Sequence, residues 1–439
     1  MGRLDLGWER RMAQAAKRVR RDDARREMLR SMDPRTGEVT REIPANTVDE
    51  VHQAVAAARR AGPSWAGLTV AERARHLGRI RHLIHERTDH IVAVVSRENG
   101  KPPAEALAHD VLTTLITLAY LGRVGPQALR PRAVGRLIGP LFGSTSRIEW
   151  RPYGVVGCVS PWNYPLFLSF MAAVPALLAG NTVVVKPSEA TPAVGEVVAE
   201  LLEVLPPGVA SVVQGGAEVG AALIDAPCDK LSFIGSAPTG RKVAEGAARH
   251  LTPVVMELGG QDATVVCEDA DLDVAASGVL WGSFLNAGQT CCAIERAYVV
   301  DSVADRFEEL LVEKLARVRG DRAGDIGPLT LERQREIVQR HVRDAVERGA
   351  TVLAGGVSQD GGKGGTPTTR PPRRRCAPSS TCCRHLAGKI AARRSAGSAG
   401  PTCGPSGPRS SSNSWPGRSC DGSCTRIRPR PRTRTPGSV

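Results

Sequence analysis

Between residues 155 and 258 the sequence alternates short apolar runs, rich in β-branched residues, with longer stretches of helical pattern. The short runs predict strands at residues 155–159, 182–185, 211–214, 230–234 and 254–256. The stretches between them predict helices at residues 167–178, 193–205, 217–224 and 239–250. This alternation indicates an α/β fold with an open parallel sheet that helices cover on both faces. Because such folds bind ligands at the carboxyl ends of their strands, we expect functional residues where each run ends.

The segments on either side of this unit are also expected to be ordered. Before it we predict a basic helix at residues 8–31, a turn at 33–38, a strand at 38–43 that returns from the turn, helices at 48–61, 69–97 and 103–123, and a hairpin-like stretch at 138–150. Thr47 is a suitable cap for the helix that starts at residue 48. After Gly260 we predict a second α/β unit with helices at residues 271–285, 302–318 and 331–347 and a strand at 351–353.

Residues 366–439 differ in composition from the rest of the chain. They contain fourteen arginines and one lysine against a single acid, so they account for the whole formal net charge of +14. Six of the eleven cysteines lie there, and large apolar residues are scarce. Such a segment cannot bury enough apolar surface to offset its ordering entropy, so we expect a disordered basic tail. Its Arg, Pro, Ser, Gly and Cys content is what a GC-rich coding region gives when translated out of frame. Our leading interpretation is a frameshifted C-terminus, with a native basic tail as the alternative.

Several other classes of function are disfavoured. The tail cysteines lack the paired spacing of structural zinc sites, so no metal is expected. Aromatic residues do not alternate with the tail arginines, so any nucleic-acid binding would be non-specific and salt-dependent. Residues 161–180 are largely apolar but contain Pro165 and Pro175, which favours a buried crossover helix over a membrane span. The N-terminus lacks an apolar signal segment, and the five cysteines outside the tail fit a reduced, cytoplasmic chain.

Two segments contain residues suited to covalent catalysis. Cys291 follows Gly288-Gln289-Thr290 and precedes Cys292, and Glu257 ends the apolar run of residues 254–256. A thiol nucleophile and a carboxylate base at the ends of separate elements form a working pair for acyl chemistry. A glutamate that ends an apolar strand should be partly desolvated, which would raise its pKa toward the range of a base at pH 7. The alternatives are two buried structural thiols and an ordinary solvated acid.

Five ordered motifs resemble those of the NAD(P)-dependent aldehyde dehydrogenase superfamily, over residues 33–365. They are Pro161-Trp-Asn-Tyr-Pro165, Lys186-Pro-Ser-Glu189, Phe233-Ile-Gly-Ser236, Met256-Glu-Leu-Gly-Gly260 and Phe284-Leu-Asn-Ala-Gly-Gln-Thr-Cys-Cys-Ala293. The resemblance implies a Rossmann-like NAD(P)-binding domain at residues 33–136 and 151–259, bridging strands at 137–150, and part of a catalytic domain at 260–365. It also implies a homo-oligomer in the intact family, with the assembly of this chain left open.

The resemblance implies a role for each catalytic residue. The family's Gly-Gln-x-Cys spacing selects Cys291 as the nucleophile, which would form a thiohemiacetal with an aldehyde and then, after hydride loss to the nicotinamide, a thioester. Glu257 would activate the water that hydrolyses this thioester. Asn163 would donate its amide to the oxyanion beside the backbone N–H of Cys291.

The resemblance also implies a cofactor site at the strand ends. Its expected members are Ser160, Pro161, Trp162, Asn163, Lys186, Pro187, Ser188, Glu189, Gly215, Gly220, Phe233, Gly235, Ser236 and Leu258. Lys186 and Glu189 would bind the adenosine ribose hydroxyls, and a carboxylate there would repel a 2′-phosphate, which favours NAD over NADP. Gly235 and Ser236 open a helix whose N–H groups would face the pyrophosphate.

The expected substrate is a small aldehyde, and residues 284–296 look most like members that act on succinate semialdehyde. The family's Glu-x-Phe-Gly-Pro motif does not appear after Gly365. An inactive remnant of such an enzyme is therefore the alternative function, with non-specific nucleic-acid binding by the tail as a remote one.

Overall fold

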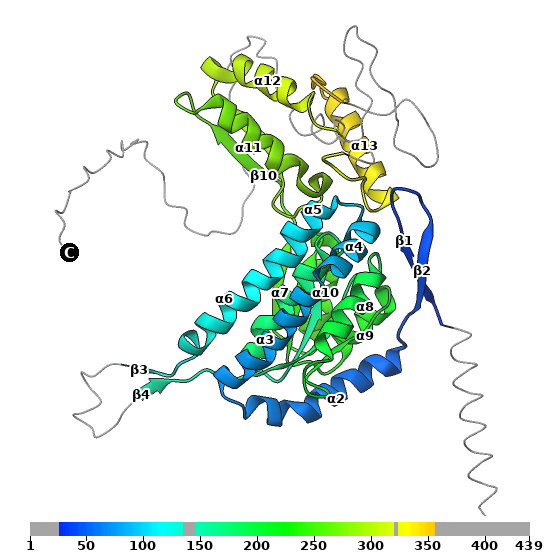
Figure 1. The fold of residues 1–439 in the computed structure, drawn as a ribbon, viewed down its shortest axis with the longest axis vertical. Coiled ribbons are helices and arrows are strands. Elements are labelled where there is room, and N and C mark those ends of the chain that lie inside the picture. Colours follow the sequence, from blue (N-terminus) through cyan, green and yellow to red (C-terminus); the bar gives the residue numbers. More distant parts are fainter. Residues whose placement is uncertain (1–25, 135–145, 320–323, 356–439) are drawn as a thin grey trace, which may run out of the picture. The chain divides into compact units, whose positions relative to one another are not determined.

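The computed structural model describes residues 26–134, 146–319 and 324–355 (Figure 1). Its main sheet has five strands in the order β7-β6-β5-β8-β9, and every neighbouring pair is parallel. The strands are β5 (Val155–Val159), β6 (Thr182–Lys186), β7 (Ala210–Val212), β8 (Lys230–Gly235) and β9 (Val254–Leu258). The predicted open parallel sheet is therefore confirmed, with each strand close to its expected place.

Helices pack on both faces of this sheet. The helices that follow the strands are α7 (Pro165–Leu178), α8 (Pro192–Leu202), α9 (Ala217–Asp225) and α10 (Ala237–Arg249), and α2 (Val48–Ala66) precedes them. Successive residues of a strand point to opposite faces. In β6, Val183 and Val185 pack with side chains of α7 and α8, whereas Val184 packs with α2 and α9. All five residues of β6 are buried, as expected for a strand with helices on both sides.

Two of the N-terminal helices start with capping boxes. Thr47 accepts from the N–H of Glu50 at the start of α2, as predicted, and Thr69 does the same for Glu72 in α3 (Val70–Glu86). The prediction of one helix over residues 69–97 is wrong, because the chain leaves helical geometry at Arg87 before α4 (Thr88–Asn99). The Thr88 hydroxyl donates to the carbonyl oxygens of Ile84 and His85 at 3.1 and 2.9 Å. Such side-chain bonds to the backbone compete with a continuous helix.

The next helical segment contains an unexpected turn. The helix predicted at residues 103–123 is present as α5 (Pro103–Glu105), the π-helical η1 (Ala106–Leu112) and α6 (Thr113–Ala128). The hydroxyl of Thr114 donates to the carbonyl oxygen of Asp110 at 2.6 Å, within the region where the two helical forms meet. The π-helical turn was not predicted.

Two antiparallel strand pairs lie outside the main sheet. β1 (Met28–Met32) pairs with β2 (Val39–Pro44), which confirms the predicted turn and returning strand. The basic helix expected over residues 8–31 is wrong for residues 28–31, because Leu29 and Ile43 bury their side chains across this pair. Its earlier residues lie outside the described part. β3 (Arg132–Val134) pairs with β4 (Ser146–Ile148), so the pair expected at 137–150 begins earlier in the sequence.

The second α/β unit is confirmed after Gly260. In it β10 (Asp262–Val266) runs parallel to β11 (Ile294–Val299), and its helices are α11 (Leu272–Phe284), η3 (Leu285–Gly288), α12 (Asp301–Leu315) and α13 (Glu332–Glu347). Figure 1 shows α11 and α12 as neighbours, and Val279, Phe307 and Leu311 form part of their shared core.

The strand predicted at residues 351–353 is wrong, because no described strand pairs with it. The tail at 366–439 lies outside the described residues. No helix in the described ranges is long and apolar enough to cross a membrane. The apolar residues after Pro161 form α7 instead, between β5 and β6.

Candidate active site

The carboxyl ends of β5, β6, β8 and β9 meet at one edge of the main sheet. The strand register pairs Val159 of β5 with Lys186 of β6 on one side and with Phe233 of β8 on the other. It also pairs Gly235 of β8 with Leu258 of β9. The strand order places β6 and β8 on opposite sides of β5, so a topological switch point lies between β5 and β8. Ligands of open α/β sheets bind at such points. The expected cofactor residues lie where β5, β6, β8 and β9 end, except Gly215 and Gly220, which follow β7.

Lys186 and Glu189 form an ion pair at the end of β6. The Lys186 Nζ donates to the Pro187 carbonyl oxygen at 3.1 Å and to Glu189 Oε2 at 3.2 Å. Burial lowers the pKa of Lys186, and the Glu189 carboxylate acts in the opposite direction. The Lys186 side chain is 5% exposed and that of Glu189 is 46% exposed, so the carboxylate meets solvent with the ammonium behind it. Ser188, buried in the same turn, accepts from the Ala190 N–H at 3.2 Å. An adjacent donor and acceptor of this kind suit the hydroxyls of a ribose.

The N-terminus of α10 lies where β8 ends. Ser236 is its N-cap and accepts from the Thr239 N–H at 3.4 Å. A Cβ on Gly235 would lie 2.7 Å from Phe233 Cζ, so a larger residue would displace that ring. The free N–H groups of a first helical turn, together with the helix dipole, attract anions. This end of the sheet is therefore suited to a phosphate group.

Gly215 and Gly220 lie on either side of the start of α9. A Cβ on Gly215 would lie 2.2 Å from Val219 Cγ2, so packing against α9 requires glycine there. A Cβ on Gly220 would lie 3.6 Å from Lys186 Cε, which is an ordinary contact. Gly220 therefore brings α9 close to the Lys186 side chain without being sterically required.

The segment after β5 is fixed through its backbone. The Ser160 N–H donates to the Lys186 carbonyl oxygen at 3.1 Å, and the Ser160 and Ser169 hydroxyls are 2.7 Å apart. Pro161 is half-buried, and the Trp162 carbonyl oxygen accepts from Asn99 Nδ2 at 3.0 Å. The turn that leads to Asn163 is thus held by β6, α7 and α4.

Glu257 and Leu258 end β9, the outer strand of the main sheet. The expected partial burial of Glu257 is wrong, because the residue is exposed. An outer strand has a neighbour on one side alone, which accounts for this exposure. Leu258 is 39% exposed, and a Cβ on Gly240 would lie 2.8 Å from its Cδ2, so it packs on the first turns of α10.

Asn163 and Tyr164 meet the segment that carries Cys291. Asn163 Nδ2 donates to the Gln289 carbonyl oxygen at 2.9 Å, and the Tyr164 and Thr290 hydroxyls are 2.6 Å apart. Asn163 Oδ1 is buried without a hydrogen-bond partner in the described part of the chain. The two motifs are 126 residues apart in sequence, so the fold, and not local structure, brings the Asn163 amide next to the cysteine segment.

Cys291 follows a strained turn. Asn286 and Ala287 have φ values of 54° and 56°, and Gly288 has a φ of 74°, so three consecutive residues are left-handed. Cys291 and Cys292 are both solvent-accessible, which excludes the alternative of two buried structural thiols. Local packing around its sulfur raises the pKa of the Cys291 thiol, and the neighbouring Cys292 adds to this effect.

The family of the chain follows from one comparison. A family model described as the aldehyde dehydrogenase family matches residues 20–370. The chain belongs to the aldehyde dehydrogenase family. The match ends close to Gly365, where the resemblance of the sequence was expected to end.

Individual relatives agree with this membership. The 4,4'-diapolycopene aldehyde oxidase of Methylomonas sp is 38% identical over 337 residues, which cover 76% of this chain and 63% of the relative. A Mycolicibacterium smegmatis protein, provisionally named succinate-semialdehyde dehydrogenase (NADP(+)), is 40% identical over 328 residues, which cover 73% and 63%. The chain thus spans slightly less than two thirds of the length of these relatives.

Solved structures of aldehyde dehydrogenases have the same fold. The Mycobacterium tuberculosis aldehyde dehydrogenase complexed with NAD+ is 33% identical to this chain and superimposes with a TM-score of 0.72. The match covers 76% of this chain and 70% of that one.

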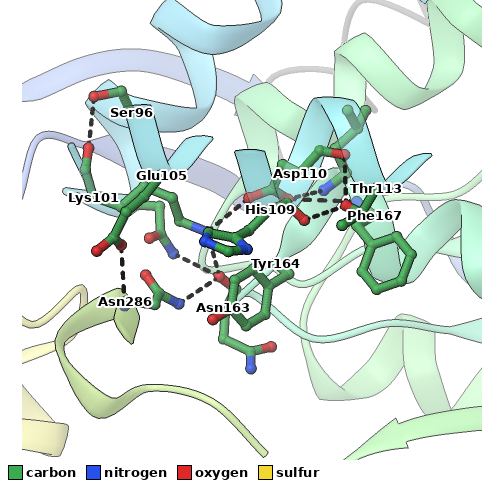
Figure 2. Close-up of polar contacts among 12 residues, drawn as sticks. Ser96, Lys101, Glu105, His109, Asp110, Thr113, Asn163, Tyr164, Phe167 and Asn286 are labelled. Carbon is green, nitrogen blue, oxygen red and sulfur yellow. Dashed lines mark hydrogen bonds and ion pairs between the residues drawn. The ribbon is translucent and has the colours of Figure 1, made fainter. Parts of the chain in front are cut away.

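In this member of the aldehyde dehydrogenase family, a polar cluster behind Asn163 was not predicted from the sequence. The Asn163 carbonyl oxygen accepts from Lys101 Nζ at 2.9 Å, from Asn286 Nδ2 at 2.8 Å and from Asn99 Nδ2 at 3.5 Å (Figure 2). Lys101 also pairs with Asp110 at 2.7 Å, and both side chains are fully buried. No local pattern in residues 99–110 signals this cluster, because its partners lie far away in the sequence.

Proposed function

We propose that the chain oxidises an aldehyde to a carboxylic acid through a thioester on Cys291. The observation that carries this proposal is the contact of the Asn163 amide with the Gln289 carbonyl oxygen, two residues before the thiol. This contact supports a site in which a nucleophile and an oxyanion donor act on the same carbonyl group. The neighbouring edge of the sheet is suited to a dinucleotide.

The carbon–sulfur bond would form by attack of the Cys291 thiolate on the aldehyde carbon, with the carbonyl π electrons moving to oxygen. The Asn163 amide and the Cys291 backbone N–H would then donate to that oxyanion. One such donor typically contributes about 10²–10³ in rate. The Asn163 amide has two N–H groups, so one can stay on the Gln289 carbonyl oxygen while the other donates to the oxyanion.

A nicotinamide dinucleotide, when bound, would supply the hydride acceptor. The residues that would hold it are the Lys186–Glu189 pair at a ribose and the N-terminus of α10, with Gly235 and Ser236, at the pyrophosphate. The exposed Glu189 carboxylate favours a free 2′-hydroxyl, and therefore NAD, because it would repel a 2′-phosphate. One relative is named for NADP(+), and a similar solved structure is a complex with NAD+.

Glu257 would act as the base that takes a proton from the water attacking the thioester, which releases the acid and restores the thiol. Its exposure in this structure leaves the carboxylate accessible to water. A general base works through direct contact or through one water molecule, so this role requires Glu257 to approach Cys291 with substrate bound.

The proposed substrate is a small aldehyde such as succinate semialdehyde. One relative is named for that compound and another, of nearly equal identity, for 4,4'-diapolycopene aldehyde. Overall identity therefore does not decide the substrate, and a panel of short-chain and long-chain aldehydes is the direct way to rank it.

The choice of nucleophile is tested by single substitutions. We expect Cys291→Ala to abolish aldehyde-dependent reduction of NAD, because no other thiol follows the Gln289 carbonyl at the same spacing. Cys292→Ala should keep most of the activity and is the matched control. NADH absorbance at saturating aldehyde is the measurement, and the opposite order of sensitivity would contradict the assignment.

A further inference from the structure

A π-helical turn faces the segment that carries Cys291. Hydrogen bonds in a π-helix join residues i and i+5, so side chains five apart come to the same side of the helix. Glu105 and Asp110 have this separation at the start of η1. Figure 2 shows the Glu105 carboxyl group beside Asn286 and the Asp110 carboxyl group on the side of Phe167. Single π-helical turns often occur at functional sites.

Each of these two carboxyl groups fixes a different part of the site. Asp110 Oδ1 accepts from the N–H groups of Leu166 and Phe167 at 3.2 and 3.4 Å, at the start of α7, and its Oδ2 accepts from Lys101. Asp110 therefore holds the Asn163 side of the site. Glu105 Oε2 accepts from the Asn286 N–H at 3.0 Å, across 181 residues of sequence. Glu105 therefore contacts the nucleophile side.

Asn286 is the first residue of the left-handed turn. A left-handed conformation is unfavourable for a residue such as Ala287 and persists only where surrounding contacts impose it. Hydrogen bonds supply such contacts here. The Glu105 carboxyl group accepts from the Asn286 N–H, and the Asn286 side-chain amide donates to the Asn163 carbonyl oxygen at 2.8 Å. Gln289 Nε2 donates to the Asn286 carbonyl oxygen at 3.0 Å. The Glu105 contact is the one in which a carboxyl group bonds the main chain of this turn directly.

We propose that Glu105 is a positioning residue, which holds the left-handed turn at Asn286 so that Cys291 is presented beside the Asn163 amide. This inference rests on the proposed function, in which Cys291 is the nucleophile. Glu105 lies outside the motifs that suggested that function. Glu105 touches neither thiol and acts through the main chain of the turn.

The surroundings of Glu105 make this contact sensitive to substitution. Burial raises the pKa of Glu105 to about 7, while its bond to Asn286 and the charge of Lys101 act in the opposite direction. The carboxyl group is thus a half-buried acceptor for a single N–H. Its removal would leave that N–H without its partner, and an amide in its place could still accept the bond.

The test compares Glu105→Ala with Glu105→Gln. Glu196→Ala is the matched control, because Glu196 is another half-buried glutamate whose pKa burial raises, but it lies in α8 and pairs with Arg41 at 2.9 Å. Hydrogen exchange of the peptide that covers residues 284–292 reports on the turn and does not require turnover. We expect exchange at Asn286 to be about tenfold faster in Glu105→Ala and within about threefold of wild type in Glu105→Gln. Glu196→Ala should leave this peptide unchanged.

Turnover gives the second readout. Glu105→Ala should lower kcat by about tenfold and change KM for NAD by less than about twofold, because the ribose and pyrophosphate residues lie on other elements. Glu105→Gln should restore most of kcat. Unchanged exchange at the turn in Glu105→Ala, an equal change in Glu196→Ala, or faster exchange with unaltered kcat would overturn the positioning role.

A wild-type protein without dehydrogenase activity would refute the proposed function separately. The positioning role would then be decided by exchange at the turn and by the ratio of Cys291 to Cys292 alkylation with iodoacetamide, read by peptide mass spectrometry. Loss of the wild-type ratio in Glu105→Ala, with its recovery in Glu105→Gln, supports the inference. An unchanged ratio overturns it.

Discussion

Glu189 combines partial exposure with a buried counter-charge. Its carboxylate is held by Lys186 Nζ at 3.2 Å, while nearly half of its side chain meets solvent. A cofactor phosphate at this point would face the negative charge, whereas a hydroxyl could donate to it. This single side chain therefore has the largest expected influence on the choice between the two dinucleotides.

We expect Glu189→Gln to shift the cofactor preference toward NADP, because it removes the charge and keeps an acceptor for a hydroxyl. The ratio of kcat/KM for NAD to that for NADP should fall by about tenfold, since loss of one repulsive contact is typically worth about 1–2 kcal/mol. Steady-state kinetics with both cofactors give this ratio. If the ratio stayed the same, Glu189 would not face the adenosine ribose.

The Cys291 thiol also needs a neighbouring group that can take up its proton. Local packing around its sulfur first and Cys292 second raise the pKa of its thiol, so the reactive thiolate is a minor species at neutral pH. The proposed chemistry therefore needs a proton acceptor near the sulfur, and Glu257 is the candidate that the sequence offers.

At the scale of elements, Glu98 connects α4 to α8. Its two carboxyl oxygens each accept one N–H at 2.9 Å, from Ala193 and Val194 in the first turn of α8. The residue is 2% exposed, and burial raises its pKa from 4.5 to about 7. The folded chain therefore keeps a proton on Glu98 that the unfolded chain loses as pH rises above 4.5.

This difference predicts a stability that falls as pH rises from about 4.5 to about 7, since the unfolded state binds fewer protons in that window. The contribution of Glu98 is at most about 3 kcal/mol. We expect Glu98→Gln to flatten this dependence, measured as the difference in unfolding free energy or Tm between pH 5 and pH 8. Glu105 titrates in the same window, so part of the slope should remain. An unaltered slope in the variant would contradict the assignment.

The elements that the sequence predicted well are those with strong local patterns. The β-branched runs located β5, β6 and β8, and Thr47 marked the start of α2, because these signals act within a few residues. The break at Arg87 and the π-helical turn depend on hydroxyl groups that bond backbone carbonyls in the folded helix, so periodicity did not reveal them.

The candidate site likewise contains some residues that the sequence predicted and others that it did not. Asn163 and Cys291 were predicted to belong to the site, and the structure places the Asn163 amide on the Gln289 carbonyl oxygen, two residues before Cys291. Glu105 was not predicted, because its partner Asn286 is 181 residues away and no spacing rule connects them. The burial expected for Glu257 failed because a strand-end pattern does not tell whether the strand lies at the edge of its sheet.

On the scale of the whole molecule, the second α/β unit exposes apolar side chains. Val265 of β10 and Tyr298 of β11 are cross-strand neighbours and are 68% and 55% exposed. A two-stranded sheet with an exposed apolar pair is a surface prone to association.

We expect the double variant Val265→Thr with Tyr298→Thr to self-associate less than wild type, because the apolar pair is removed while β-branched residues remain in the strands. Sedimentation velocity over a range of concentrations measures this change. Leu251→Asn is the control, since Leu251 is 89% exposed, lies outside the second unit and has a left-handed φ of 53° that asparagine tolerates. Equal weight-average sedimentation coefficients in the double variant and wild type would show that association does not use this pair.

Thr330 makes two hydrogen bonds near the site, to residues that are far from it in the sequence. Its hydroxyl donates to the Asn99 carbonyl oxygen at 2.6 Å, and its N–H donates to Gln289 Oε1 at 2.9 Å. During synthesis, the main sheet has all five strands once residue 258 has left the ribosome, but these two bonds must wait for residue 330. The nascent chain therefore passes through a stage in which all five strands of the sheet are available while Gln289 and Asn99 still lack their bonds to Thr330. Contacts between residues so distant in sequence form late and slowly, so we expect the nucleophile segment to reach its final arrangement after the sheet has formed.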